Sequence, residues 1–165
     1  MSRARRRTWE ELREEMVSSP ARAFGTLYRR FQAAANAAYA ARGWKDSTLA
    51  HVQFLTEIDE SGTRLSDVAA ALGTTKQYAG KVAKDLQSKG LITLGSDPDD
   101  GRAVLARPTT RARSFFEDAC EVRGELEAAF LAGLSPSRAS TFVTMLEDLV
   151  AARSGTERLD HKGGR

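Results

Sequence analysis

The sequence predicts a mainly α-helical fold with one small β-hairpin, an α+β class, because apolar residues at helical spacing surround a short stretch of strand and turn residues. Residues 65–109 hold a short helix, a tight turn, a second helix and a hairpin in that order. Longer apolar stripes flank this segment on both sides. This order of elements is typical of a winged helix-turn-helix, a fold that binds duplex DNA.

Two helices are expected before this segment. The first carries an apolar stripe over residues 24–39 and ends before Gly43. The second follows a cap at Ser47 and carries apolar residues over 49–58. Each stripe gives its helix one face that can be buried against the rest of the protein.

The helix-turn-helix is expected to begin at Ser66, which can cap a short helix that Gly73 ends. Thr74 and Gln77 have the spacing of a capping box, so the second helix is expected to start at Thr74. One stripe of this second helix is apolar and can pack: Ala79, Val82, Ala83 and Leu86. The opposite stripe is polar and basic: Gln77, Lys81, Lys84 and Ser88.

Gly80 lies in the middle of this second helix, near its polar face. Glycine costs a helix interior about 1 kcal/mol relative to alanine. Two explanations stay open: the backbone approaches DNA closely at this point, or a helix held by tertiary packing tolerates the residue.

The wing is expected after Lys89-Gly90, where residues 91–94 and about 103–106 form two strands joined by the turn-rich residues 95–101. Asp97, Asp99 and Asp100 lie in this turn and faintly suggest calcium. Their spacing lacks the further ligands of a calcium loop, so a β-turn explains them better, and no metal or other cofactor is expected.

Two long helices are expected after the wing. The first carries apolar residues over 116–130, and Ser135-Pro136 opens the second, whose stripe covers 142–150. The long helices hold surplus apolar surface, which predicts a symmetric homodimer. Each copy would contribute one reading head, which is its helix-turn-helix with the wing, and the two reading heads would bind a pseudo-palindromic operator.

The segment from Leu86 to Thr109 resembles the multiple-antibiotic-resistance regulator (MarR) family of bacterial transcription factors. The resemblance rests on Leu86-x-x-x-Gly90-Leu91-Ile92, on Asp97-Pro98-x-Asp100-x-Arg102 and on Thr109, and extends more loosely over residues 21–152. It implies that Asp100 braces the wing and that Arg102 enters the minor groove. It also implies a regulator, expected here to be a repressor, that a small aromatic effector releases from DNA.

Base-reading side chains are expected in the exposed N-terminal half of the second helix: Thr75, Lys76, Gln77, Tyr78 and Lys81. Gln77 can pair with adenine and Lys81 with guanine, whereas Lys84 and Lys89 are expected to meet phosphate. Each has a simpler alternative, since surface lysines are usually solvated and Tyr78 can pack against a neighbouring helix.

An effector pocket is expected among aromatic residues and one titratable group: Tyr28, Phe31, Trp44, His51 and Phe54. The alternative for the aromatic residues is an ordinary core position. For His51 it is a capped or solvent-facing helix position.

The chain of 165 residues is therefore expected to divide into three parts. Residues 1–20 form a basic N-terminal arm or tail, residues 21–152 form a single domain, and residues 153–165 form a flexible C-terminal tail. The domain holds the winged helix-turn-helix at about 47–109 and dimerisation helices at about 21–42 and 110–152. The N-terminal arm or tail contains four arginines that can follow a DNA groove or remain solvated: Arg3, Arg5, Arg6 and Arg7.

The charge distribution favours a DNA partner. Residues 74–113 contain eight Lys or Arg and four Asp, a net charge of +4, whereas the whole chain carries +3. No run approaches the roughly 18 apolar residues of a membrane helix, and the N-terminus lacks the apolar core of a secretion signal, so a cytoplasmic protein is expected. The single cysteine, Cys120, is expected to be a small buried hydrophobe, and a thiol sensor is the alternative.

An enzyme is the competing class, but the two histidines, the lone cysteine and the absence of a Gly-rich phosphate loop or metal-spaced cluster give it little support. A stronger alternative is a winged-helix protein-interaction module without specific DNA binding. Leu94 and Gly95 stand where the MarR family often has arginines, which favours the module slightly. Four basic residues together oppose it: Lys81, Lys84, Lys89 and Arg102.

Overall fold

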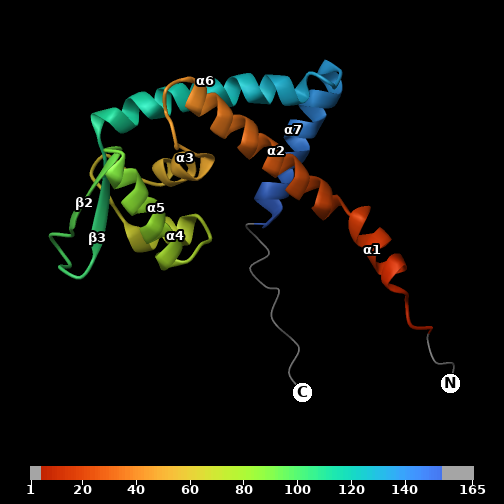
Figure 1. Ribbon diagram of the computed structural model, residues 1–165, viewed down its shortest axis with the longest axis horizontal. Helices are drawn as coiled ribbons and strands as arrows, with labels where there is room; N and C mark the ends of the chain where they lie inside the picture. The colour runs from red at the N-terminus through yellow and green to blue at the C-terminus, as the bar shows by residue number, and fades with distance from the viewer. Residues whose placement is uncertain (1–4, 154–165) are drawn as a thin grey trace. The chain divides into compact units, whose positions relative to one another are not determined.

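The computed structural model describes residues 5–153, which form seven helices and a small three-stranded sheet (Figure 1). The predicted class, mainly helical with a β wing in a winged helix-turn-helix, is confirmed. The helices are α1 (Trp9–Val17), α2 (Pro20–Ala41), α3 (Leu49–Thr56), α4 (Leu65–Ala71), α5 (Lys76–Ser88), α6 (Thr110–Leu131) and α7 (Pro136–Arg153). The chain divides into two compact units, one up to Leu126 and one from Glu127, and each is described by itself.

The N-terminal region contains a helix that the sequence analysis did not predict. Thr8 and Glu11 cap α1 reciprocally, within residues expected to form an arm or tail. The helix was missed because it has only nine residues, too few for a clear periodic stripe. Arg3 and the tail beyond Arg153 lie outside the described residues. The next helix, α2, begins with Pro20 at its first position, as a helix start favours.

Three predicted helix caps are wrong by one or two residues. Thr48, not Ser47, precedes α3, and α4 begins at Leu65, so Ser66 lies inside it. The cap of α5 is Thr75, whose hydroxyl accepts from the backbone N–H of Tyr78. The expected cap, Thr74, instead donates its backbone N–H to the carbonyl of Ala69, so it closes α4. The N-terminal half of α5 therefore begins directly after its cap, Thr75.

The sheet has the strand order β1 (Thr63–Arg64), β3 (Val104–Pro108), β2 (Ile92–Ser96), and all neighbours are antiparallel. The predicted hairpin is therefore present, with both strands starting one residue later than expected and extending further. In its register Leu94 pairs with Ala106. The third strand, β1, has two residues and left no alternating pattern that the sequence could show.

The core of the first unit joins the reading head to α2 and α6. The predicted inward stripe of α5 is buried, and it packs with a cluster that includes Phe54, Val68 and Phe115. Phe115 replaces Phe116 as the fully buried aromatic of α6, and its ring contacts Tyr39 edge-on at 5.5 Å between centroids. This packing fixes the inner face of α5, so its other face is left to solvent.

Two further expectations concern α6 and α7. Cys120 is exposed, which overturns its expected burial. The buried positions of α6 are Ala112, Phe115, Ala119 and Val122, and Cys120, between the last two in the chain, lies on another side of the helix. The last helix begins at Pro136 as predicted, and several of its apolar side chains are exposed: Val143, Met145, Leu146, Leu149 and Val150. Within the described residues, no helix is long and apolar enough to cross a membrane.

Candidate nucleic-acid interface

One face of α5 is polar, basic and open to solvent. Its exposed residues include six that were expected to meet DNA, among them the cap Thr75: Thr75, Lys76, Gln77, Tyr78, Lys81 and Lys84. The opposite face of the same helix is buried at Ala79, Val82, Ala83 and Leu86. The apolar stripe thus determines which side chains of α5 a partner can reach.

The cations on this surface are available to a partner. Within residues 5–153, Lys76, Lys81, Lys84 and Arg102 form no ion pair with any acidic side chain. Lys89 differs, because its ammonium lies 2.6 Å from Asp85 one helical turn earlier. The structure therefore gives Lys89 an internal partner in place of the expected phosphate contact.

A hollow lies in the middle of this face. It has a volume of about 700 Å³ and is lined by Thr75, Gln77, Tyr78, Gly80, Lys81 and Lys84. A Cβ atom built on Gly80 would meet no other group within 4 Å. The hollow is therefore open above the backbone of Gly80, with polar and basic side chains around it.

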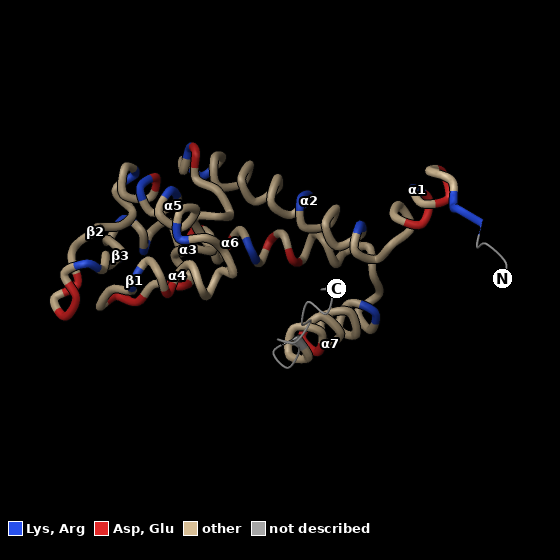
Figure 2. The backbone as a smooth tube through the Cα atoms, turned by 90° about the horizontal axis from the view of Figure 1, so that it is seen from below, with Lys and Arg blue, Asp and Glu red and all other residues tan. Residues whose placement is uncertain are grey.

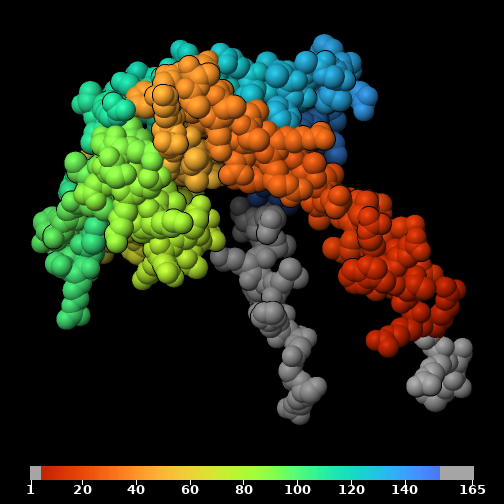
Figure 3. All heavy atoms as spheres, in the orientation of Figure 1, coloured from red at the N-terminus to blue at the C-terminus, as the bar shows by residue number. Residues whose placement is uncertain are grey.

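The wing lies next to this face in the same unit and projects as a narrow finger (Figure 3). In its turn, the carboxylate of Asp100 accepts from the backbone N–H of Arg102 at 3.1 Å, and the carbonyl of Asp100 accepts from Ala103 at 2.8 Å. Figure 2 shows acidic residues at the tip of the wing with basic residues beside them. Arg102 is exposed there, and its backbone is held by the Asp100 carboxylate.

A buried carboxylate, which sequence reasoning did not select as a support, ties the wing to the helix-turn-helix. Asp97 is only 6 % exposed and accepts from the backbone N–H of Asp99 at 2.9 Å and from Arg64 Nε at 2.6 Å. The hydrogen bond from the Asp99 backbone, followed by the one from Arg64, holds the pKa of Asp97 below its ordinary value. Since Arg64 immediately precedes α4, this contact joins the wing turn to the start of the helix-turn-helix.

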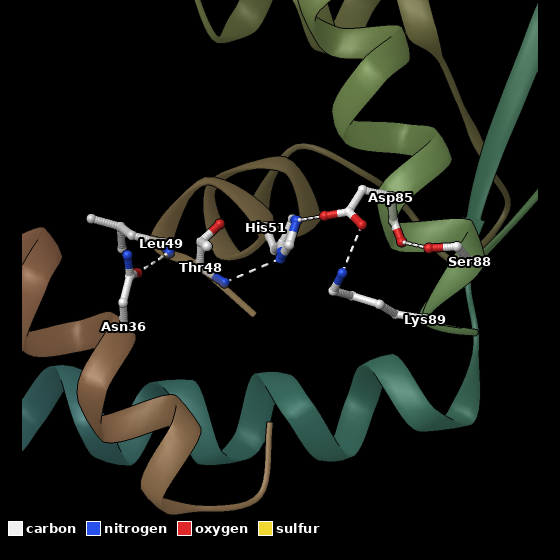
Figure 4. Close-up of polar contacts among 7 residues, drawn as sticks. All are labelled: Asn36, Thr48, Leu49, His51, Asp85, Ser88 and Lys89. Atoms are coloured by element: carbon white, nitrogen blue, oxygen red, sulfur yellow. Dashed lines mark hydrogen bonds and ion pairs between the residues drawn. The ribbon is translucent and has the colours of Figure 1, made fainter. Parts of the chain in front are cut away.

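A polar cluster joins α3 to α5 behind the exposed face (Figure 4). Thr48 donates its backbone N–H to His51 Nδ1 at 3.1 Å, so in the neutral ring the proton is on Nε2, which lies 2.8 Å from Asp85. His51 is 4 % exposed, and burial lowers its pKa, although the nearby Asp85 acts in the opposite direction. Lys89 binds the other oxygen of Asp85, and its hydrogen bond is the largest cause that lowers the pKa of that carboxyl.

The residues expected to form an effector pocket are not gathered into one cavity. Tyr28 and Phe54 line a cavity of about 290 Å³, whereas Trp44 lines a separate one of about 190 Å³. His51 belongs to the polar cluster, and Phe31 is half-buried on α2 without lining either cavity.

A larger cavity of about 600 Å³ lies between the end of α3 and the start of α6. Its walls include Leu55, Ile58, Arg113, Phe116 and Cys120, none of which sequence reasoning selected as a pocket residue. Their only sequence signal is the apolar spacing of the helices that carry them. Within the described part of the chain, no group of three or more His, Cys, Asp or Glu could hold a metal ion.

Comparison with known proteins relates this geometry to one family. A model of the MarR family matches residues 46–103, which cover the helix-turn-helix and the wing turn. No curated protein matches the sequence.

The chain also matches solved structures with the same fold, and these matches cover most of its length. Wild-type MarR from E. coli in its apo form is 18 % identical, with a TM-score of 0.68, and the match covers 79 % of this chain and 96 % of MarR. MepR from S. aureus, solved in complex with DNA, is also 18 % identical at a TM-score of 0.68, covering 81 % and 98 %. BpsR from Bordetella bronchiseptica, whose DNA binding is regulated by 6-hydroxynicotinic acid, is 21 % identical at 0.67, covering 81 % and 94 %.

Proposed function

We propose that this chain is a winged-helix protein of the MarR family and a DNA-binding transcriptional regulator that recognises a specific operator. The observation that carries the proposal is the exposed basic face of α5, whose lysines form no ion pair with the described acidic residues, beside a wing that presents Arg102. The family and the fold are those of regulators, and we propose no enzymatic activity.

The geometry of α5 supports reading in the major groove. A recognition helix contacts base edges through its N-terminal residues, and here that half exposes Lys76, Gln77 and Lys81. The Gln77 amide can donate to and accept from adenine, and Lys81 can donate to guanine. Lys84 lies one turn further along and suits a phosphate, while Arg102 on the wing suits the minor groove.

A homodimer follows from the same proposal. One recognition helix reads only a few base pairs, so a specific operator needs two reading heads. The exposed apolar side chains of α2 (Phe24, Leu27 and Tyr28), and separately those of α7, supply surface that a second copy can bury. We therefore propose that the domain at residues 21–152 dimerises through its long helices and binds a pseudo-palindromic site, as a repressor located in the cytoplasm.

A small effector is a further part of the proposal. MepR was solved with DNA, and BpsR responds to 6-hydroxynicotinic acid, an aromatic acid. The cavity between α3 and α6 combines the apolar side chains of Leu55, Ile58 and Phe116 with the guanidinium of Arg113. Its volume of about 600 Å³ lies within the range of small-molecule sites, so it can accept an aromatic ligand. The smaller cavity at Tyr28 and Phe54 is the other candidate.

The test is fluorescence anisotropy of the purified protein with fragments of its own upstream intergenic region and scrambled controls, at two salt concentrations. The proposal predicts nanomolar affinity that favours the native fragment by about 10³-fold or more. It also predicts a log-linear loss of affinity with salt, because lysines on phosphates release counterions. No binding at low salt would refute the proposal and favour a winged-helix protein-interaction module.

A further inference from the structure

The bare backbone at Gly80 is placed at the centre of the exposed face of α5. Gly80 follows Lys76 by four residues and precedes Lys84 by four, so these side chains lie one turn to either side of it. Gln77 precedes it by three residues and Lys81 follows it directly. The residues that surround Gly80 are thus those proposed to meet DNA.

The fold itself has no need of a glycine at this position. Gly80 is in regular helix. Among the described residues a left-handed backbone occurs elsewhere, at Asp46 and at glycines such as Gly73 and Gly90. A Cβ atom at Gly80 would meet nothing within 4 Å, so no neighbouring helix or strand packs against the missing side chain. An alanine would fit this structure and would favour the helix.

The open hollow indicates that the glycine serves contact with a partner and not packing within the protein. Its rim is formed by Thr75, Gln77, Tyr78, Lys81 and Lys84, and its floor is the backbone of Gly80. A rim of donors and cations around a floor that carries no side chain suits the edge of a base pair, which offers acceptors and, at thymine, a methyl group. A side chain on the floor would hold the helix away from such an edge.

We infer that Gly80 is a specificity-determining position, at which the backbone of α5 approaches the base edges more closely than any side chain would allow. This inference rests on the proposed DNA-binding function and names a residue that acts by lacking a side chain. Of the two explanations that the sequence alone left open for this glycine, the inference adopts the close approach of the backbone to DNA.

The experiment compares wild type with Gly80→Ala by thermal unfolding and by anisotropy on the operator and on scrambled DNA. The variant is expected to unfold about 2–4 °C higher, since it gains helix propensity. Its operator affinity is expected to fall about tenfold or more, the effect of one mismatched base pair, while its affinity for scrambled DNA stays within about twofold. Gly124→Ala is the matched control for stability, because Gly124 is also inside a helix and its Cβ would also meet nothing within 4 Å.

Three results would overturn the inference. Operator affinity equal to wild type would show that the groove has room for a side chain at this position. A loss of affinity with a lower unfolding temperature than wild type would assign Gly80 to the helix instead of the DNA. Wild-type protein that does not distinguish the operator from scrambled DNA would refute the proposed function itself, and with it the inference.

Discussion

The burial of His51 predicts a specific dependence of stability on pH. Burial lowers the pKa of His51 below 6.5, its ordinary value, while the unfolded chain titrates near that value. Between the two pKa values the unfolded chain binds the proton more readily, so the free energy of unfolding falls as the pH falls below about 6.5. Above that pH the contribution is fully present.

The magnitude follows from the number of groups involved. One titrating group changes the free energy of unfolding by at most about 1.4 kcal/mol per pH unit. Asp85 and Asp97 have pKa values lowered from 3.8, so their contributions are lost only in more acidic solution. From pH 7.5 to 5.5 we therefore expect His51 to lower the free energy of unfolding, within that limit. Protonation of Nδ1 would also abolish its hydrogen bond from Thr48 at the start of α3.

The assay is urea unfolding at a series of pH values and at fixed protein concentration, for wild type and for His51→Gln. Glutamine retains an amide donor and acceptor but does not titrate, so the free energy of unfolding of the variant should depend less on pH between pH 7.5 and 5.5. The contributions of the other ionisable groups are shared by both proteins. Parallel curves for the two proteins would refute the reasoning, because His51 would then have the same pKa in the folded and unfolded states.

Four other substitutions test the interface, its supports and the exposure of Cys120. Lys81→Ala should weaken operator binding by about 1–3 kcal/mol and relax specificity. Lys84→Ala should weaken binding to all sequences and reduce the slope of log affinity against log salt by about one. Fluorescence anisotropy measures both effects. Asp97→Asn removes the carboxylate that accepts from Arg64, so it should lower the unfolding temperature and weaken operator binding. If neither quantity changed, the contact between Asp97 and Arg64 would not support the interface. Cys120→Ser should change the free energy of unfolding by less than about 0.5 kcal/mol, because Cys120 is exposed. A thiol reagent should label Cys120 in the folded wild type, and failure to label it would contradict its exposure.

Local pattern made the reading head predictable. The buried stripe of α5, from Ala79 to Leu86, has helical spacing, and the choice of buried face determines the exposed one at Lys81 and Lys84. Cap positions were less predictable, because Thr74 and Thr75 can both supply a capping oxygen. Which of them does so depends on where α4 closes, and Thr74 is used there.

The supports of the site depend on contacts between distant residues, which no local pattern encodes. Arg64 and Asp97 are 33 residues apart, and His51 and Asp85 are 34 apart. The candidate effector cavity likewise brings the end of α3 to the start of α6. The exposure of Cys120 depends on the face of α6 that packs, and the stripe drawn through Phe116 in place of Phe115 did not identify that face.

Footprinting of the protein on its operator at saturation tests the central claim most directly. A pair of reading heads predicts two equivalent protected half-sites related by two-fold symmetry, with centres about one helical turn of DNA apart. Protection of a single asymmetric half-site would contradict the homodimeric reader, and the absence of any protected site at concentrations that saturate binding would contradict sequence-specific recognition.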